Sequence, residues 1–533
     1  KSPNTYHATG RDANGNLIYE QTRQGTENLA YSLSAKGDRT IYLEAALNYK
    51  NTFGRHDVSG MLLFNQSDEI NTKATNVEEA LPYRFRGLAG RFTYGFDDRY
   101  FAEFNFGYNG SENFTPKNRY GFFPSVGLGW VISNESFFEP LTNVIQYLKV
   151  RGTWGQVGNS QISGRRFAYL ATVTDSSSTS YTFGKNMDQN YGTTAIDEYA
   201  VDVTWEVADK TDIGVDMRLL NNKLNLQFDY FKESREGIYL RRSSIPSYVG
   251  MINNPYGNIG KVENKGFELS VNYANSWGGD WSLSLMGNYS FNRNKVLEDD
   301  STVVYPWQNT IGNKVGQRFG LVALGLFESY GEIAASPVQT GDTRPGDIKY
   351  KDINGDGKID EYDKVPIGWG SVPEIMYGFG FSVGWKNLSL TAMFQGAAHV
   401  DAMLSGEGVL PFSQGSSRGN LLSNITDRWT EENPRQNAFY PRLSIGNINM
   451  NYEESTWWLK DTDYLRLKNI ELSYRLPDHW MKRIHLDNAR IFIQGVNLLT
   501  FSSFKIWDVE LGDGRGARYP NIASVSLGVN FNF

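Results

Sequence analysis

Apolar and polar residues alternate along many stretches of this chain. In the last eleven residues the apolar positions are Ala523, Val525, Leu527, Val529, Phe531 and Phe533. Because successive side chains of a strand point to opposite faces, this stretch predicts a strand with one apolar and one polar face. A soluble domain seldom ends on such a strand. A transmembrane barrel needs it, since one face meets lipid and the other meets a wet lumen.

The same alternation recurs in long runs throughout the sequence. It predicts strands within 43–49, 58–64, 102–108, 126–130, 148–154, 213–219, 224–230, 267–273, 281–291, 375–385, 388–394 and 465–476. The longest runs cover 11 to 15 residues, whereas strands of ordinary globular proteins have about 5–6. In the last range the alternation changes phase at Lys468-Asn469, which predicts a β-bulge there.

The connections between these runs fall into two classes. Short turns are expected at 54–57, 97–99, 221–223, 277–280 and 386–387. Long loops are expected at 71–85, 110–120, 158–202, 241–261, 296–373, 400–462 and 500–521. Short turns at one end and long loops at the other are typical of outer-membrane barrels, whose long loops are extracellular. The connections at 133–144 and 477–486 fall at the periplasmic end and are unusually long for it.

The predicted fold class is therefore all-β, a transmembrane antiparallel β-barrel to which this chain contributes about 15 or 16 strands. The alternative is a set of soluble β-sandwiches. Those would expose the second apolar face of every strand as a large patch, which soluble monomers rarely tolerate.

Composition agrees with export to a membrane. The 533 residues include no cysteine and no apolar run long enough for a spanning helix, and the mean hydropathy is -0.47. A net charge of -7 without any Lys/Arg run argues against nucleic acid as a partner. The chain begins at Lys1 without a signal peptide, so we expect it to be processed or to be part of a longer polypeptide.

One loop has the spacing of a calcium site. The expected oxygen ligands of residues 352–363 are Asp352, Asn354, Asp356, the carbonyl of Lys358, Asp360 and Asp363. Gly357 takes the position of the sharp turn, and Asp363 replaces the usual glutamate, which weakens bidentate binding. We expect a structural Ca²⁺ in an extracellular loop. The alternative is an Asx-rich turn without metal.

Catalytic patterns are not apparent. The five histidines, His7, His56, His399, His479 and His485, belong to no zinc, nucleophile-elbow or P-loop motif. The glycine-rich segment 512–516 does not lead from a strand into a helix, so it predicts a loop rather than a nucleotide site. We therefore expect neither catalytic nor cofactor-binding residues, and no enzyme activity. The ligand-binding residues stay unassigned.

Several short stretches resemble a known family. They are 119–125 with Gly129-Trp130, 148–155, 264–269, 346–350 leading into 352–363, 464–469 and 495–501. In this order they resemble the C-terminal part of SusC/RagA-type TonB-dependent transporters of Bacteroidota. The resemblance implies a barrel of about 22 strands, of which about six, with the plug domain, the TonB box and the signal peptide, would precede Lys1. Residues 1–39 would be the loop or strand start of the fragment. Residues 40–533 would be barrel wall, with large extracellular loops near 158–202, 296–373 and 400–462.

The resemblance also implies a function in the outer membrane of a Gram-negative cell. The transporter would import its ligand actively, with a SusD-like surface lipoprotein as lid and with energy from TonB-ExbB-ExbD acting on the plug. An oligosaccharide is the leading ligand class and an oligopeptide the second; a passive porin and a binding-only receptor are the alternatives. Lumen charges of both signs are compatible with a neutral ligand: Arg91, Lys149, Arg151, Arg466 and Arg475 with Glu103, Asp229, Glu268 and Glu471. For the loop tryptophans we favour packing within the loops over stacking on sugars: Trp307, Trp369, Trp429, Trp457 and Trp458.

Overall fold

A computed structural model describes most of the chain. The described residues are 3–26, 28–29, 31, 33, 35, 37–74, 77–162, 165–406, 408–412, 421–446, 448–483 and 486–532. The terminal Phe533, His485 and the loop residues 413–420 lie outside them. In the described part of the chain, no helix is long and apolar enough to cross a membrane.

One antiparallel sheet of 15 strands dominates the structure. Along the chain its strands are β3 (Asp38–Phe53), β4 (His56–Asn71), β5 (Tyr83–Phe96), β6 (Tyr100–Ser111), β7 (Tyr120–Val131), β8 (Ile145–Asn159), β11 (Glu206–Leu219), β12 (Leu224–Arg241), β13 (Tyr256–Trp277), β14 (Trp281–Glu298), β21 (Ile375–Trp385), β22 (Leu388–Ala398), β25 (Tyr464–Arg475), β26 (Asn488–Ser502) and β27 (Ser524–Asn532). Each strand pairs with the next one in this order. The order ends with β3 and β27, so the described residues do not close the barrel.

The strands confirm the all-β prediction, and they are longer than the alternation alone indicated. β13 has 22 residues and β12 and β14 have 18 each. The predicted bulge is also confirmed. Met393 of β22 lies opposite Asn469 of β25, whereas Phe394 lies opposite Leu467, so Lys468 is the extra residue.

The two faces of the sheet differ in chemistry. On one face Gly214, Asp229, Glu268 and Ser290 lie opposite one another on β11 to β14. On the other face the neighbouring row is Val215, Phe228, Leu269, Tyr289 and Tyr377. We call these the polar face and the apolar face. Aromatic and aliphatic side chains of the apolar face are widely exposed, as a surface that lies against lipid requires.

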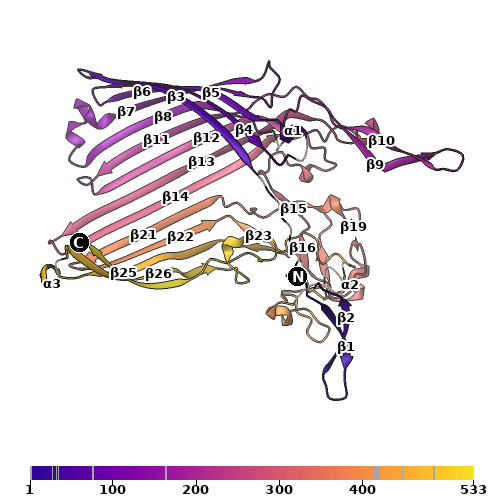
Figure 1. Cartoon of the computed structure of the whole chain (residues 1–533). Helices are drawn as coiled ribbons and strands as arrows, with labels where there is room; N and C mark the ends of the chain where they lie inside the picture. The colour runs from indigo at the N-terminus through magenta and orange to yellow at the C-terminus, as the bar shows by residue number, and fades with distance from the viewer. Residues whose placement is uncertain are drawn as a thin grey trace. The chain divides into compact units, whose positions relative to one another are not determined.

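Short turns and long loops lie at opposite ends of the sheet, as predicted. Figure 1 shows the C-terminus and α3 (Asp478–Arg483) at the end with the short turns, and the loop strands β15, β16 and β19 at the other end. The turn after β11 uses Asn221 and Asn222 at φ of 58° and 63°, which asparagine tolerates better than most residues. The long connection at 133–144 contains the short 3-10 helices η1 (Ile132–Asn134) and η2 (Ser136–Leu141).

The long loops fold rather than merely connect. Loop 158–202 contains the hairpin of β9 (Thr172–Phe183) and β10 (Gln189–Glu198). Loops 296–373, 400–462 and 500–521 pack together around Trp458, Tyr350 and Tyr440, each 1% exposed. We call this packed region the loop body. Its elements are β15 (Arg318–Gly320), β16 (Ala323–Leu326), α2 (Tyr330–Ala334), β17 (Val338–Gln339), β18 (Ile348–Tyr350), β19 (Lys358–Ile359), β20 (Val365–Ile367), β23 (Asp401–Met403) and β24 (Leu459–Asp461), with the 3-10 helices η4 (Pro306–Gln308), η5 (Glu361–Asp363), η6 (Ser423–Thr426) and η7 (Val509–Leu511).

Contacts divide the chain into two compact units. The first comprises Lys1–Glu44 and Asn65–Arg86, and the second comprises Ala45–Phe64 and Gly87–Phe533. The first contains the hairpin of β1 (Thr5–Arg11) and β2 (Leu17–Arg23) and the short helix α1 (Val77–Ala80). The first unit is therefore not continuous in the sequence, because it combines the N-terminal residues with segment 65–86. All sites described below lie in the second unit.

Candidate functional site

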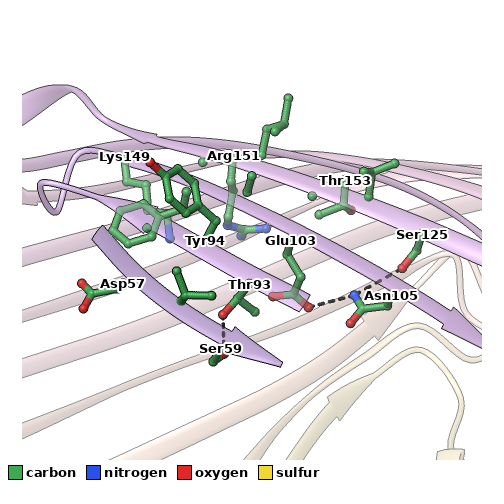
Figure 2. Close-up of a pocket in the computed structure, with 18 of the residues that line it drawn as sticks. Asp57, Ser59, Thr93, Tyr94, Glu103, Asn105, Ser125, Lys149, Arg151 and Thr153 are labelled. Atoms are coloured by element: carbon green, nitrogen blue, oxygen red, sulfur yellow. Dashed lines mark hydrogen bonds between the residues drawn. The ribbon is translucent and has the colours of Figure 1, made fainter. Parts of the chain in front are cut away.

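The polar face is hollowed near the short turns. A cavity of about 550 Å³ lies over β3 to β8 there, and Figure 2 shows its polar lining. Glu103 accepts hydrogen bonds from Arg91 at 2.9 Å and from Asn105 at 2.8 Å. Asn105 also reaches Ser125, and Ser59 pairs with Thr93 at 2.5 Å. These polar groups are therefore already paired with one another, which suits the wall of a water-filled lumen.

Arg151 forms the centre of a charged cluster on the same face. Its guanidinium donates to Asp212 at 3.0 Å, to Asp216 at 3.3 Å and to Asp229. Gly214 lies between Arg151 and Asp229, and a Cβ there would come within 2.5 Å of both side chains. Three carboxylates around one arginine leave this part of the wall negative. The sequence placed Arg151 and Asp229 in the lumen, but it did not show that they meet.

Other charged residues predicted for the lumen have different surroundings. Glu471 accepts from Arg490 of the next strand at 2.6 Å. Arg466 lies on the polar face, in the row of Asn288 and Gln395, but only 2% of its side chain is exposed, so it is not open to the lumen. It donates to Asp508 at 2.8 Å and to Glu510 at 2.7 Å, and so ties β25 to the last long loop.

A second cavity lies at the long-loop end of the polar face. Its volume is about 870 Å³, and residues of β11 to β14 and of segment 310–319 line it. Arg235 bridges Glu206 at 3.0 Å and Glu233 at 2.9 Å on one wall. The apolar part of the lining consists of Ile238, Leu240, Val262, Val296, Val315 and Phe319. Apolar surface with a few polar groups of both charge signs is the usual composition of a small-molecule site.

A charged and aromatic cluster adjoins this second cavity. Arg293 donates two hydrogen bonds to Glu374, at 2.7 and 3.2 Å, and Lys314, which also lines the cavity, reaches Glu374 at 3.4 Å. His399 contacts the same carboxylate at 3.2 Å and stacks on Trp369 with ring centres 4.0 Å apart. Burial raises the pKa of Glu374, but the hydrogen bonds and positive charges outweigh it and hold this pKa below its usual range.

The loop tryptophans divide into two groups. Trp429 and Trp458 are buried in the loop body, and Trp457 packs against it, so these three agree with the interpretation that we favoured. Trp369 remains 42% exposed, next to the second cavity's Lys314. Trp307 stacks on Tyr305 at 4.6 Å and donates to the carbonyl of Tyr362, which fixes it beside the predicted calcium loop.

The predicted calcium loop forms a series of Asx turns. Asp352 accepts from the amides of Gly355 and Gly357, which have φ of 75° and 82°. Asp363, fully buried, accepts from Ile353 and Asp360. Asn354, Asp356 and Asp360 likewise accept from amides of the same loop. With these contacts, no group of three or more acidic or histidine side chains in the described part of the chain is gathered as a metal site.

A buried carboxylate that the sequence did not single out connects distant segments of the loop body. Asp347 is 1% exposed and accepts from Nε and Nη2 of Arg442, each at 2.9 Å. Asn449, Asn451 and the amide of Arg344 also donate to it, at 3.1, 2.8 and 2.8 Å. The side chains that donate to it lie about a hundred residues away, and no local pattern marks such a pairing.

Comparison with known proteins gives a consistent result. The family model described as "TonB dependent receptor-like, beta-barrel" matches residues 2–498. TonB-dependent receptor P3 of Formosa agariphila is 28% identical over 83% of this chain and 45% of its own length. TonB-dependent receptor SusC of Bacteroides thetaiotaomicron is 27% identical over 83% of this chain and 43% of its own.

Solved structures agree on the fold. The chain is similar to the structure of the RagAB peptide transporter, with a TM-score of 0.70 and 21% identity. The match covers 93% of this chain and 56% of that one. Its 'open-open' state gives a TM-score of 0.71. The chain thus spans about half the length of the curated relatives that it matches.

Proposed function

The chain belongs to the TonB-dependent receptor-like β-barrel family, and we propose that it supplies wall, lumen lining and extracellular loops of an outer-membrane importer. It is a SusC/RagA-type barrel chain of the outer membrane, from a family of receptors and transporters rather than enzymes. The observation that carries the proposal is the 15-stranded sheet itself, apolar on one face and hollowed and polar on the other.

Import requires partners beyond this chain. Backbone groups along β3 and β27 need neighbours, because an unpaired strand edge in lipid costs several kcal/mol for each group. We propose that further strands of the same protein close the barrel and that a plug fills it. TonB-ExbB-ExbD would act on the plug, and a SusD-like lipoprotein would cover the long-loop end. The folded loop body, with its own core, is a firm surface on which such a lid can rest.

We further propose an oligosaccharide as the ligand. Charges around the second cavity are of both signs and largely paired with one another, as Arg235 is with Glu206 and Glu233. A neutral ligand rich in hydroxyl groups suits such a wall better than a ligand of one charge sign. Apolar residues such as Val262 and Phe319 would contact the sugar rings. An oligopeptide is the alternative, in line with the RagAB fold.

A cavity-filling variant tests the proposal. Val262→Trp, made in the full-length receptor with its lid, fills part of the second cavity from β13. Val271→Trp is the matched control, because it makes the same change on the same strand but on the apolar face. We expect uptake of a labelled oligosaccharide to fall about tenfold in the first variant only, the effect of about 1.4 kcal/mol of lost binding. Uptake should also stop without TonB.

Three outcomes would contradict the parts of this proposal separately. Uptake that continues without TonB would indicate a passive pore. Uptake of labelled peptides but not of oligosaccharides, still sensitive to Val262→Trp, would replace the ligand class and keep the importer. Equal effects of both tryptophan variants would remove the second cavity from the transport path.

We also propose that residues 352–363 bind Ca²⁺. The support is the ligand spacing together with the tight turns at Gly355 and Gly357, where a calcium loop needs a sharp bend. Asp352, Asn354, Asp356, the Lys358 carbonyl, Asp360 and Asp363 would supply the ligands. The ion would stabilise this part of the loop body and take no part in ligand chemistry.

A further inference from the structure

The apolar face of β13 and β14 has a definite height. From Trp281 to Phe291 the residues of β14 on this face are Trp281, Leu283, Leu285, Gly287, Tyr289 and Phe291. On β13 the corresponding stretch runs from Trp277 to Phe267 and is likewise free of charge. Ten residues at about 3.4 Å each, tilted by about 40°, rise about 25 Å, which is the height of the apolar band of an outer-membrane barrel. Phe267 and Phe291 therefore mark its border on the long-loop side.

The first position beyond this border is a cation on three adjacent strands. Lys232 follows Tyr230 on β12, Lys265 precedes Phe267 on β13, and Arg293 follows Phe291 on β14, each on the apolar face. Lys232 lies opposite Lys265, and Lys265 lies opposite Arg293. We call these three residues the cation row. Their side chains are 51%, 58% and 49% exposed, and Arg293 at the same time holds Glu374 at the rim of the sheet.

The acidic residues that face the cation row do not balance it. Glu263 contacts Lys232 at 2.9 Å and Lys265 at 3.5 Å, so one carboxylate serves two lysines. Glu374 pairs with Arg293 but is shared with Lys314 and His399. Lys295, the next outward position on β14, adds a fourth cation and has no ion pair among the described residues. Four cations against two carboxylates leave a net charge of +2 where like charges sit directly opposite one another, an arrangement that disfavours the strand pairing unless an anion is present.

We propose that the cation row binds the phosphate groups of an anionic glycolipid in the outer leaflet. The cations lie outside the barrel, one residue pair above the aromatic border, and thus at the level of lipid head groups. The phosphate of a glycolipid bound there accepts hydrogen bonds from Lys232, Lys265 and Arg293. The acyl chains of the same lipid cover Tyr230, Phe267 and Phe291. Basic residues close to an anionic membrane surface strengthen binding about fivefold each. The site is independent of the ligand that the lumen carries.

A double variant with a matched control tests this site. Lys232→Gln with Lys265→Gln removes two charges of the cation row in the full-length receptor. Lys210→Gln is the control, because Lys210 lies on β11 at a similar distance from the turns and is 50% exposed, but it is on the polar face and pairs with Glu233. Binding of lipid A in mixed detergent micelles is measured by native mass spectrometry, next to dephosphorylated lipid A and inorganic phosphate. Retained heat-modifiable mobility on gels shows that each variant is folded.

We expect the double variant to bind phosphorylated lipid A about 25-fold more weakly, and the control to bind it as the unmodified receptor does. Dephosphorylated lipid A should bind all three alike. Equal binding by the double variant and the unmodified receptor, or an equal loss in Lys210→Gln, would overturn the proposal. Full competition by millimolar inorganic phosphate would overturn the lipid assignment and indicate a small-anion site. If the double variant does not fold, Lys265→Gln alone should show about a fivefold loss, and no loss would overturn the proposal equally.

Discussion

Replacing Asp347 by alanine should open the loop body without unfolding the barrel. Asp347 connects two segments that are far apart in the sequence, since it accepts two hydrogen bonds from Arg442 and one each from Asn449 and Asn451. The Arg442 side chain is only 18% exposed. Asp347→Ala would leave this charge without its carboxylate and would remove an acceptor from each of the two side-chain amides.

The structure sets the size of the effect. Removing one partner of a buried, hydrogen-bonded ion pair costs about 3–5 kcal/mol, and we take about 4 kcal/mol because Asp347 is 1% exposed and Arg442 only 18%. Asp342→Ala is the control. Asp342 pairs with Arg344, but the two side chains are 43% and 52% exposed, so solvent screens this pair and its loss should change the stability little.

Hydrogen exchange of the full-length receptor in detergent measures the difference. A loss of about 4 kcal/mol in opening free energy should speed amide exchange around residues 347 and 442–451 about a thousandfold in Asp347→Ala. Exchange in β13 and β14 should not change, because these strands are stabilised by their own ladders. Unchanged exchange in the loop body, or equal acceleration in Asp342→Ala, would refute the reasoning that this buried network holds the loops together.

Three further predictions concern the charged clusters. Arg151→Met should lower the free energy of barrel unfolding by about 2 kcal/mol in urea titrations, because three carboxylates lose their shared cation; a value no larger than that of the neighbouring Lys149→Met would contradict this. The pKa of Glu374 is held below its usual range, so its stabilising contacts are fully present above the ordinary carboxyl pKa of about 4.3 and are lost as the pH falls through the lowered value. The thermal midpoint of Glu374→Gln should therefore depend less on pH below about 4 than that of the unmodified receptor. Millimolar Ca²⁺ should raise the thermal midpoint of the receptor by a few degrees and Asp352→Asn should abolish the rise; an equal rise in that variant would place calcium elsewhere.

Local pattern predicted the strands, their two faces, and which end of the barrel carries the long loops. Alternation with a period of two assigned Asp229 and Glu268 to one face and Phe228 and Leu269 to the other, and the change of phase located the bulge at Lys468. The loop body could not be predicted in this way. Its core residues, such as Tyr350 and Trp458, come from irregular segments without periodicity, so the sequence presented these segments only as long loops.

The sequence by itself determined which residues face lipid and which face the lumen, because the side-chain direction in a strand follows from its parity alone. It also determined the family, through short stretches spread over most of the chain. Only the tertiary structure decided which charges meet. The register between strands brings Lys232, Lys265 and Arg293 side by side, and the packing of distant loops brings Asp347 to Arg442. These contacts depend on turn lengths and on neighbours far along the chain, and a local pattern does not contain either.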